Sequence, residues 1–177
     1  MIDNYQKFTN YRNEYKSLYF EGVKSILSDF YIELELHYSL DKKIDFRHIL
    51  RIKKNSTLKS IIDLKQYEKL IIGLGIVEGI NYYKLAAPKN LIIECDELSD
   101  EEKLWWINLY YNGLGEYRYL NNINISEEEF LNIESTGSKV EKTKLENLKG
   151  NLILVGGGKD SITSSKREWQ QSPYRFW

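Results

Sequence analysis

"FYIELELHYSL", residues 30–40, alternates apolar and polar side chains along its whole length. An alternation with period two predicts a half-buried β-strand, with Ile32, Leu34 and Leu36 on the buried face. "KIDFRHILRIKK", residues 43–54, shows nearly the same alternation, and the short polar segment between the two suits a hairpin turn. We therefore expect the strands at 30–40 and 44–53 to pair antiparallel.

The outer faces of these two strands carry opposite charges. Antiparallel pairing would set Glu33 and Glu35 among Arg51 and Lys53, and such cross-strand pairs stabilise a sheet modestly. His48 falls on the apolar side of the second strand, which favours a packed core histidine over a catalytic base. The basic run at 41–59 and the acidic run at 94–102 are interpreted as solvated faces.

Downstream of residue 57 the hydrophobic period changes from that of a strand to that of a helix. A helical stripe is predicted through Ile61, Leu64, Tyr67, Ile71 and Leu74, and Gly73, Gly75 and Gly79 are expected to loosen it before "INYYKLAAP". "NLIIEC" predicts a short strand. Ser99 with Glu102, and Ser126 with Glu129, have the spacing of capping boxes, so each pair predicts a helix start; the first helix should stop at Gly113.

These elements predict an α+β N-terminal domain with antiparallel strands and helices over residues 1–133. Residues 134–150 are polar with hardly an apolar anchor, which predicts a linker. Residues 151–177 would then begin a second domain.

Composition excludes several classes of function. The 177-residue chain has a net charge of −1, one cysteine and two histidines, so a disulfide framework and most zinc patterns are excluded. The near-neutral charge gives no field for nucleic acid or anionic lipid. No run of 18 apolar residues and no signal peptide is present, which predicts a cytoplasmic protein without nucleic-acid or membrane partners.

The stretch "NLILVGGGKDSITS", residues 151–164, has the pattern of a phosphate-binding loop. An apolar strand followed by consecutive glycines and a polar residue presents backbone N–H groups to phosphate oxygens. The loop is not a Walker A loop, since Ile153 and Asp160 occupy positions where that pattern requires Gly and Ser or Thr. A tight glycine turn after a strand is the structural alternative.

The loop resembles the PP-loop of the ATP pyrophosphatase superfamily, whose pattern is S-G-G-x-D-S. Gly156 stands where that family has Ser, followed by Gly157, Gly158, Lys159, Asp160 and Ser161. The resemblance implies that residues 156–161 bind ATP and that Asp160 orders the loop or contacts Mg²⁺.

Three ordered motifs together resemble the UDP-N-acetylmuramoyl-L-alanyl-L-glutamate epimerase family. They are "GINYYKLAAP" at 79–88, "LYYNGLGEYRYLNN" at 109–122 and "VGGGKDS" at 155–161; Asn81 and Tyr117 depart mildly from the family pattern. The resemblance covers residues 30–163, the N-terminal part of a full-length member. It implies an isomerase of peptidoglycan biosynthesis that inverts the terminal L-Glu of UDP-MurNAc-L-Ala-L-Glu, using ATP and Mg²⁺ and releasing AMP and pyrophosphate.

The epimerisation bases are not decided by the sequence. Lys84, Glu116 and Tyr83 are candidates by chemical type. Each also has a structural interpretation: Tyr83 as a core aromatic, Lys84 as a solvated tip and Glu116 as a surface charge.

The end of the chain is expected to be the truncated start of an α/β PP-loop domain of Rossmann-like type. "SSKREWQQSPYRFW", residues 164–177, has no helical stripe, and Pro173 interrupts it. We expect a fragment that is inactive alone and binds ATP weakly. The alternatives are another PP-loop amidating or thiolating enzyme, and a non-enzymatic binding module; the oligomeric state stays open.

Overall fold

The computed structural model describes residues 3–54 and 63–143 of the chain. All of these lie in one compact unit, Met1–Thr143. Its elements, in chain order, are α1 (Asn4–Glu14), β1 (Ser17–Leu27), β2 (Tyr31–Leu40), β3 (Ile44–Lys53), η1 (Leu64–Tyr67), α2 (Glu68–Ala86), β4 (Asn90–Ile93), α3 (Asp100–Gly113), α4 (Gly115–Leu120), α5 (Glu127–Phe130) and β5 (Asn132–Ser135). The unit is an α+β domain, as the alternating strands and capping boxes predicted.

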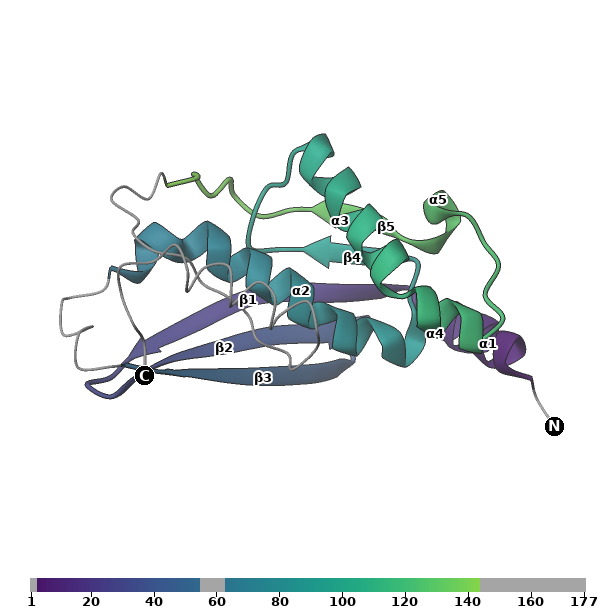
Figure 1. The fold of residues 1–177 in the computed structure, drawn as a ribbon, viewed down its shortest axis with the longest axis horizontal. Coiled ribbons are helices and arrows are strands. Elements are labelled where there is room, and N and C mark those ends of the chain that lie inside the picture. The colour runs from purple at the N-terminus through teal and green to yellow at the C-terminus, as the bar shows by residue number, and fades with distance from the viewer. Residues whose placement is uncertain (1–2, 55–62, 144–177) are drawn as a thin grey trace, which may run out of the picture. The chain divides into compact units, whose positions relative to one another are not determined.

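A mixed five-stranded sheet with the order β3-β2-β1-β4-β5 forms the framework (Figure 1). The strands β1, β2 and β3 are antiparallel, whereas β4 and β5 run parallel to β1. The predicted pairing of 30–40 with 44–53 is confirmed, with Leu34 opposite Leu50. The prediction of antiparallel strands alone missed the parallel half of the sheet.

The hairpin turn between β2 and β3 uses left-handed backbone at Asp41 and Lys42, with φ of 49° and 57°. Asp41 suits this conformation because its carboxylate accepts hydrogen bonds from the backbone N–H groups of Lys16 and Ser17. The turn is thereby tied to the start of β1.

Opposite charges pair across the outer face of the hairpin. Arg51 Nε donates to Glu33 Oε2 at 2.6 Å, as expected. Glu35 pairs with Arg47 at 3.3 Å rather than with Lys53, which lies opposite Tyr31. His48 is half-buried, not part of the core, and its Nδ1 lies 3.2 Å from Tyr82 Oη.

Helix α2 packs on the inner face of the sheet, and its glycines are part of the contact. The predicted stripe is only partly right over this helix: Ile71 packs against the core, but Leu74 is exposed, and the buried residues include Ile72, Gly75, Ile76, Gly79 and Tyr83. A Cβ at Gly75 would overlap the ring of Phe20, so a side chain there would hold α2 away from β1. Gly73, Gly75 and Gly79 therefore do not end the helix, which continues through "INYYKLA".

Three buried tyrosines connect the layers. The hydroxyl of Tyr38 donates to Gly75 O at 2.7 Å, that of Tyr110 to Ile76 O at 2.6 Å, and that of Tyr83 to Phe130 O at 3.0 Å. Each hydroxyl thus finds a main-chain acceptor inside the core, which removes the cost of burying it.

The helix α1 is held by Arg12. Its guanidinium donates to the carbonyl oxygens of Ala87, Glu129 and Phe130, which belong to the ends of α2 and α5. A planar group with five donors can satisfy several carbonyls at once. Arg12 therefore joins the N-terminal helix to two distant segments.

Both capping boxes are confirmed. Ser99 accepts from Glu102 N while the Glu102 side chain accepts from Ser99 N, and Ser126 and Glu129 repeat the arrangement at the start of α5. Helix α3 ends at Gly113, as predicted.

The start of the expected linker needs correction. Glu134 and Ser135 belong to β5, and the compact unit extends to Thr143, so residues 134–143 are part of the domain. The rest of the expected linker, and the loop at 156–161, lie outside the described residues. Within the described residues, no helix is long and apolar enough to cross a membrane.

Candidate functional site

The carboxyl ends of the parallel strands β1, β4 and β5 lie along the same edge of the sheet. In α/β sheets, ligands bind beyond the carboxyl ends of parallel strands, where loops carry the functional groups. Here Cys95 and Asp96 follow β4, and residues 136–140 follow β5. This edge is therefore where the fold favours a site.

A groove lies at this edge, between the start of α2, the second half of β1 and the segment after β5. It consists of two hollows of about 310 and 610 Å³. They are neighbours, since Lys65, Glu68 and Cys95 line both, and we call the two together the groove. The smaller hollow is also lined by Val23, Ser25, Leu64, Ile71 and Ile72; the larger is also lined by Asp63, Gln66, Ser138, Lys139, Val140, Glu141 and Thr143.

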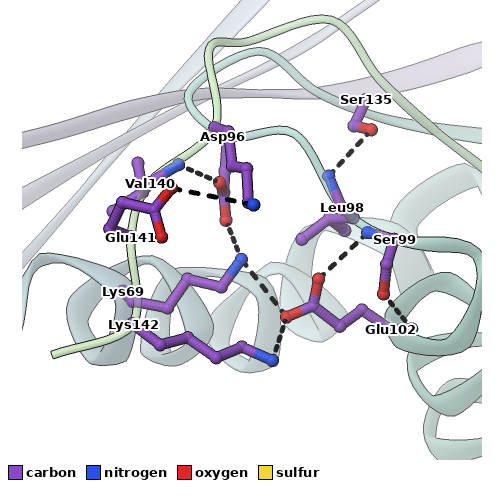
Figure 2. Close-up of polar contacts among 10 residues, drawn as sticks. Lys69, Asp96, Leu98, Ser99, Glu102, Ser135, Val140, Glu141 and Lys142 are labelled. Atoms are coloured by element: carbon purple, nitrogen blue, oxygen red, sulfur yellow. Dashed lines mark hydrogen bonds and ion pairs between the residues drawn. The ribbon is translucent and has the colours of Figure 1, made fainter. Parts of the chain in front are cut away.

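Asp96 is the buried charge beside the groove. Its side chain is 0% exposed, and Lys69 Nζ donates to Oδ2 while Val140 N donates to Oδ1 at 2.9 Å (Figure 2). Burial alone would lower the pKa of Lys69, but its hydrogen bonds to Asp96 and Glu102 outweigh that effect and raise it. Both oxygens of Asp96 are therefore occupied within the chain.

Glu102 extends this network to the surface. It accepts from Ser99 N, and it pairs with Lys69 at 3.3 Å and with Lys142 at 3.1 Å. Burial alone would raise its pKa, but the Ser99 N–H and the two ammonium groups outweigh burial and lower the pKa to about 2. Glu102 is thus ionised throughout the neutral range.

The segment 135–142, which we call the strap, forms one wall of the groove. Leu98 N donates to Ser135 Oγ at 3.0 Å, and Thr136 N donates to Ile93 O at 2.9 Å. A Cβ at Gly137 would collide with the backbone of residues 94–96, so only glycine allows the strap to lie this close. The strap is thereby held against the loop that follows β4.

Cys95 is a protonated thiol in this setting. Burial first, and the neighbouring Asp96 second, raise its pKa to about 12, so little thiolate exists at neutral pH. Within the described residues, no group of three His, Cys, Asp or Glu side chains is placed to hold a metal ion. The described part of the groove can bind and orient a ligand, but it offers no obvious nucleophile.

The residues named from the sequence as bases are not brought together. Tyr83 is fully buried, and burial raises its pKa well above the ordinary value. Lys84 and Glu116 are both exposed. Within 3–54 and 63–143, no hydrogen bond or ion pair joins any two of the three. Their catalytic role stays a prediction, and the loop residues 156–161 lie outside the described residues.

Lys69, Asp96 and the strap were missed by the sequence analysis. Asp96 was counted in an acidic run that was interpreted as a solvated face, and for this residue the interpretation is wrong. The available signal was its place directly after an apolar strand, where a carboxylate can be buried at the sheet edge. Lys69 gave no such signal, because its helix was expected to bury a different face.

Comparison with known proteins gives concordant findings. The MurL N-terminal domain family matches residues 10–169. A UDP-N-acetyl-alpha-D-muramoyl-L-alanyl-L-glutamate epimerase from Xanthomonas oryzae pv. oryzae (strain MAFF 311018) is 26% identical over 91 residues, 51% of this chain and 20% of the relative. A protein of the same name from Micromonospora sp. (strain ATCC 39149 / NRRL 15099 / SCC 1413) is 36% identical over 92 residues, again 51% of this chain and 20% of the relative. The matched region thus spans about a fifth of either relative's length. No solved structure matches the chain.

Proposed function

Because this chain belongs to the MurL N-terminal domain family, we propose that it forms the N-terminal part of an ATP-dependent epimerase. The substrate is UDP-MurNAc-L-Ala-L-Glu, whose terminal glutamate is inverted. The observation that carries this proposal is the family match over 10–169, supported by the shared name of the two relatives.

The chemistry explains why such an enzyme needs ATP. The α-proton next to a carboxylate is held tightly, because its removal builds negative charge beside an existing charge. Transfer of AMP from ATP to the carboxylate removes that charge and releases pyrophosphate, after which a positioned base can take the proton and another group can return it on the opposite face. Hydrolysis of the acyl adenylate by water then releases AMP and restores the carboxylate. The backbone N–H groups of Gly157 and Gly158 suit phosphate oxygens, and the carboxylate of Asp160 suits Mg²⁺.

In this proposal the groove contributes binding, and the candidates for the proton transfer remain Tyr83, Lys84 and Glu116. Asp96 has both oxygens engaged and Cys95 is protonated, so neither is free to act as a base. The groove beside them is polar and open enough to hold part of a ligand. In this proposal the domain holds the substrate, and the loop at 156–161 holds the nucleotide.

A domain replacement tests the proposal. Residues 1–169 of this chain replace the corresponding region of the Micromonospora relative, and the product is incubated with UDP-MurNAc-L-Ala-L-Glu, ATP and Mg²⁺. The nucleotide-linked dipeptide recovered from the reaction is then hydrolysed, and chiral chromatography of the glutamate released from it measures the inversion. We expect D-glutamate together with AMP, and a loss of both of about 100-fold or more in Gly157→Val and Asp160→Ala, since a lost transition-state contact costs that much.

Ser165→Ala, outside the loop pattern, is the matched control and should retain activity. A folded replacement protein that yields only L-glutamate would contradict the epimerase assignment. Undiminished AMP release in Gly157→Val and Asp160→Ala would contradict the nucleotide site instead.

A further inference from the structure

The second half of β1 has an open edge beside the groove. The parallel ladder joins only Ser17–Phe20 to Asn90–Ile93, whereas β1 continues past a bulge at Glu21 to Leu27. Glu94 N donates to Phe20 O, so the edge of β1 toward which this carbonyl points is the edge that faces β4. In the described part of the chain, no strand pairs with that side of residues 23–27.

The backbone phase shows which groups point to this edge. Ser28 N donates to Tyr31 O, so Ser28 and every second residue before it turn their N–H and C=O toward β2. Val23 and Ser25 belong to the alternate set of residues, and in the β1–β2 register they face Leu36 and Leu34. Their N–H and C=O groups therefore point away from β2, and the same two residues line the smaller hollow of the groove.

The rest of the groove complements such an edge. Ile71 and Ile72 form an apolar wall, and Lys65 lies where the two hollows meet. Lys65 makes no ion pair with any described residue, so its ammonium group can pair with a ligand carboxylate, although Glu68 lines both hollows as well. Alternating N–H and C=O groups, an apolar wall and a cation are what an extended acidic peptide requires.

We propose that this edge of β1 and the groove beside it bind the L-Ala-L-Glu arm of the precursor by strand addition, an inference that rests on the proposed function. Five extended residues span about 16 Å and a dipeptide about 7 Å, so residues 23–27 are long enough. The peptide amides pair with Val23 and Ser25, the alanine methyl contacts Ile71 and Ile72, and a glutamate carboxylate meets Lys65.

The binding is measured on the 177-residue chain by NMR, with ¹⁵N-labelled protein and UDP-MurNAc-L-Ala-L-Glu as the probe. We expect the amide resonances of Val23, Ser25 and Cys95 to move. UDP-MurNAc without the dipeptide should leave them in place. If the two probes move these amides equally, or if only amides remote from the groove move, the inference is overturned.

Two substitutions at one position sharpen the test. Ser25→Pro removes an N–H that points to the groove and not to β2, so the β1–β2 ladder is retained while strand addition is blocked. We expect about tenfold weaker binding for Ser25→Pro, and binding within about twofold of the parent for Ser25→Ala, since one or two lost hydrogen bonds have that effect. Equal affinities of the two variants would refute strand addition.

Lys65→Met provides a second test if the circular dichroism spectrum shows that Ser25→Pro is unfolded. Its side chain is exposed, so the fold should persist, and the affinity should fall about tenfold. An unchanged affinity in Lys65→Met would contradict the proposed contact between Lys65 and the glutamate carboxylate. Because binding is measured without turnover, failure of the epimerase assay would leave this result intact, and failure here would leave the epimerase assay intact.

Discussion

The antiparallel strands β1–β3 and the parallel strands β4 and β5 are stabilised by different kinds of contact. In the first region, continuous alternation buries Leu34, Leu36 and Tyr38 against α2, and charges pair on the outer face. In the second region, each strand has four residues, and a buried ion pair and the close approach of Gly137 hold the strap. Both regions bury apolar side chains, Leu91, Ile93 and Ile133 among them in the second, but only the second adds a buried ion pair and a backbone contact that requires glycine.

This difference predicts different sensitivities. Apolar packing is spread over many atoms, so it fails where volume is added and tolerates changes of charge. A buried ion pair concentrates its free energy in two groups, so removal of one leaves the other desolvated. Substitutions in the two regions therefore separate the two modes of stabilisation.

Gly75→Ala should break the packing of α2 on the antiparallel strands. The added methyl group overlaps the buried ring of Phe20, and overpacking of this kind costs about 3 kcal/mol of unfolding free energy. Gly113→Ala is the control, since nothing lies within 4 Å of the added atom, and it should be neutral or stabilising by about 0.5–1 kcal/mol. Urea denaturation measures both. Similar losses in the two variants would show that the contact with Phe20 does not limit stability.

Asp96→Asn tests the parallel region. The amide can still accept from Val140 N, but Lys69 loses its buried charged partner and keeps only Glu102, so we expect a loss of about 2–3 kcal/mol. Glu141→Gln, an exposed carboxylate in the same strap, should cost less than about 0.5 kcal/mol. Thermal denaturation compares them, and an equal effect of the two would contradict a special role for the buried pair.

Acid should weaken the parallel region through Glu102. Its folded pKa of about 2 lies below the unfolded value, so its contribution is full above about pH 5 and is lost as the pH falls toward 2. We expect this loss to be about 1–2 kcal/mol after allowance for solvent screening. Glu102→Gln keeps a capping side chain without the charge and should lack this part of the pH dependence. If the unfolding free energies of the parent and of Glu102→Gln fall equally between pH 5 and pH 2, the low pKa of Glu102 is not the source of the acid sensitivity.

The smallest effect is expected on the outer face of the antiparallel strands. Arg51→Met removes the pair with Glu33, yet Arg51 is 65% exposed, so the loss of unfolding free energy should be the smallest of those considered. A double-mutant cycle with Glu33→Gln measures the coupling. A coupling as large as the loss in Asp96→Asn would mean that polar contacts matter equally in both regions.

The same difference explains what could be predicted from the sequence. Residues 30–40 alternate over their full length and residues 44–53 nearly so, and the serines and glutamates of the capping boxes are three residues apart, so both signals are local. The pairing of β1 with β4 is not local, because residues 17–20 meet residues 90–93. The buried face of α2 was missed because Gly75 and Gly79 do not register as apolar.

The candidate site was predicted less well than the fold. The groove is lined by residues from β1, α2 and the strap, and no short motif contains them together. Asp96 was hidden in a run of acids, and its burial depends on Lys69, which is 27 residues away. The glycine loop at 156–161 was visible as a motif but lies outside the described residues.

The three carbonyl contacts of Arg12 have a consequence for synthesis on the ribosome. The acceptors on Ala87, Glu129 and Phe130 are 75, 117 and 118 residues further along the chain. Helix α1 leaves the ribosome first, but its partners emerge only after nearly the whole domain has been translated. An 11-residue helix is marginal alone, so the N-terminal segment must wait without a stable structure while the sheet forms. The first helix of the domain to be made is therefore among the last of its elements to be fixed in place.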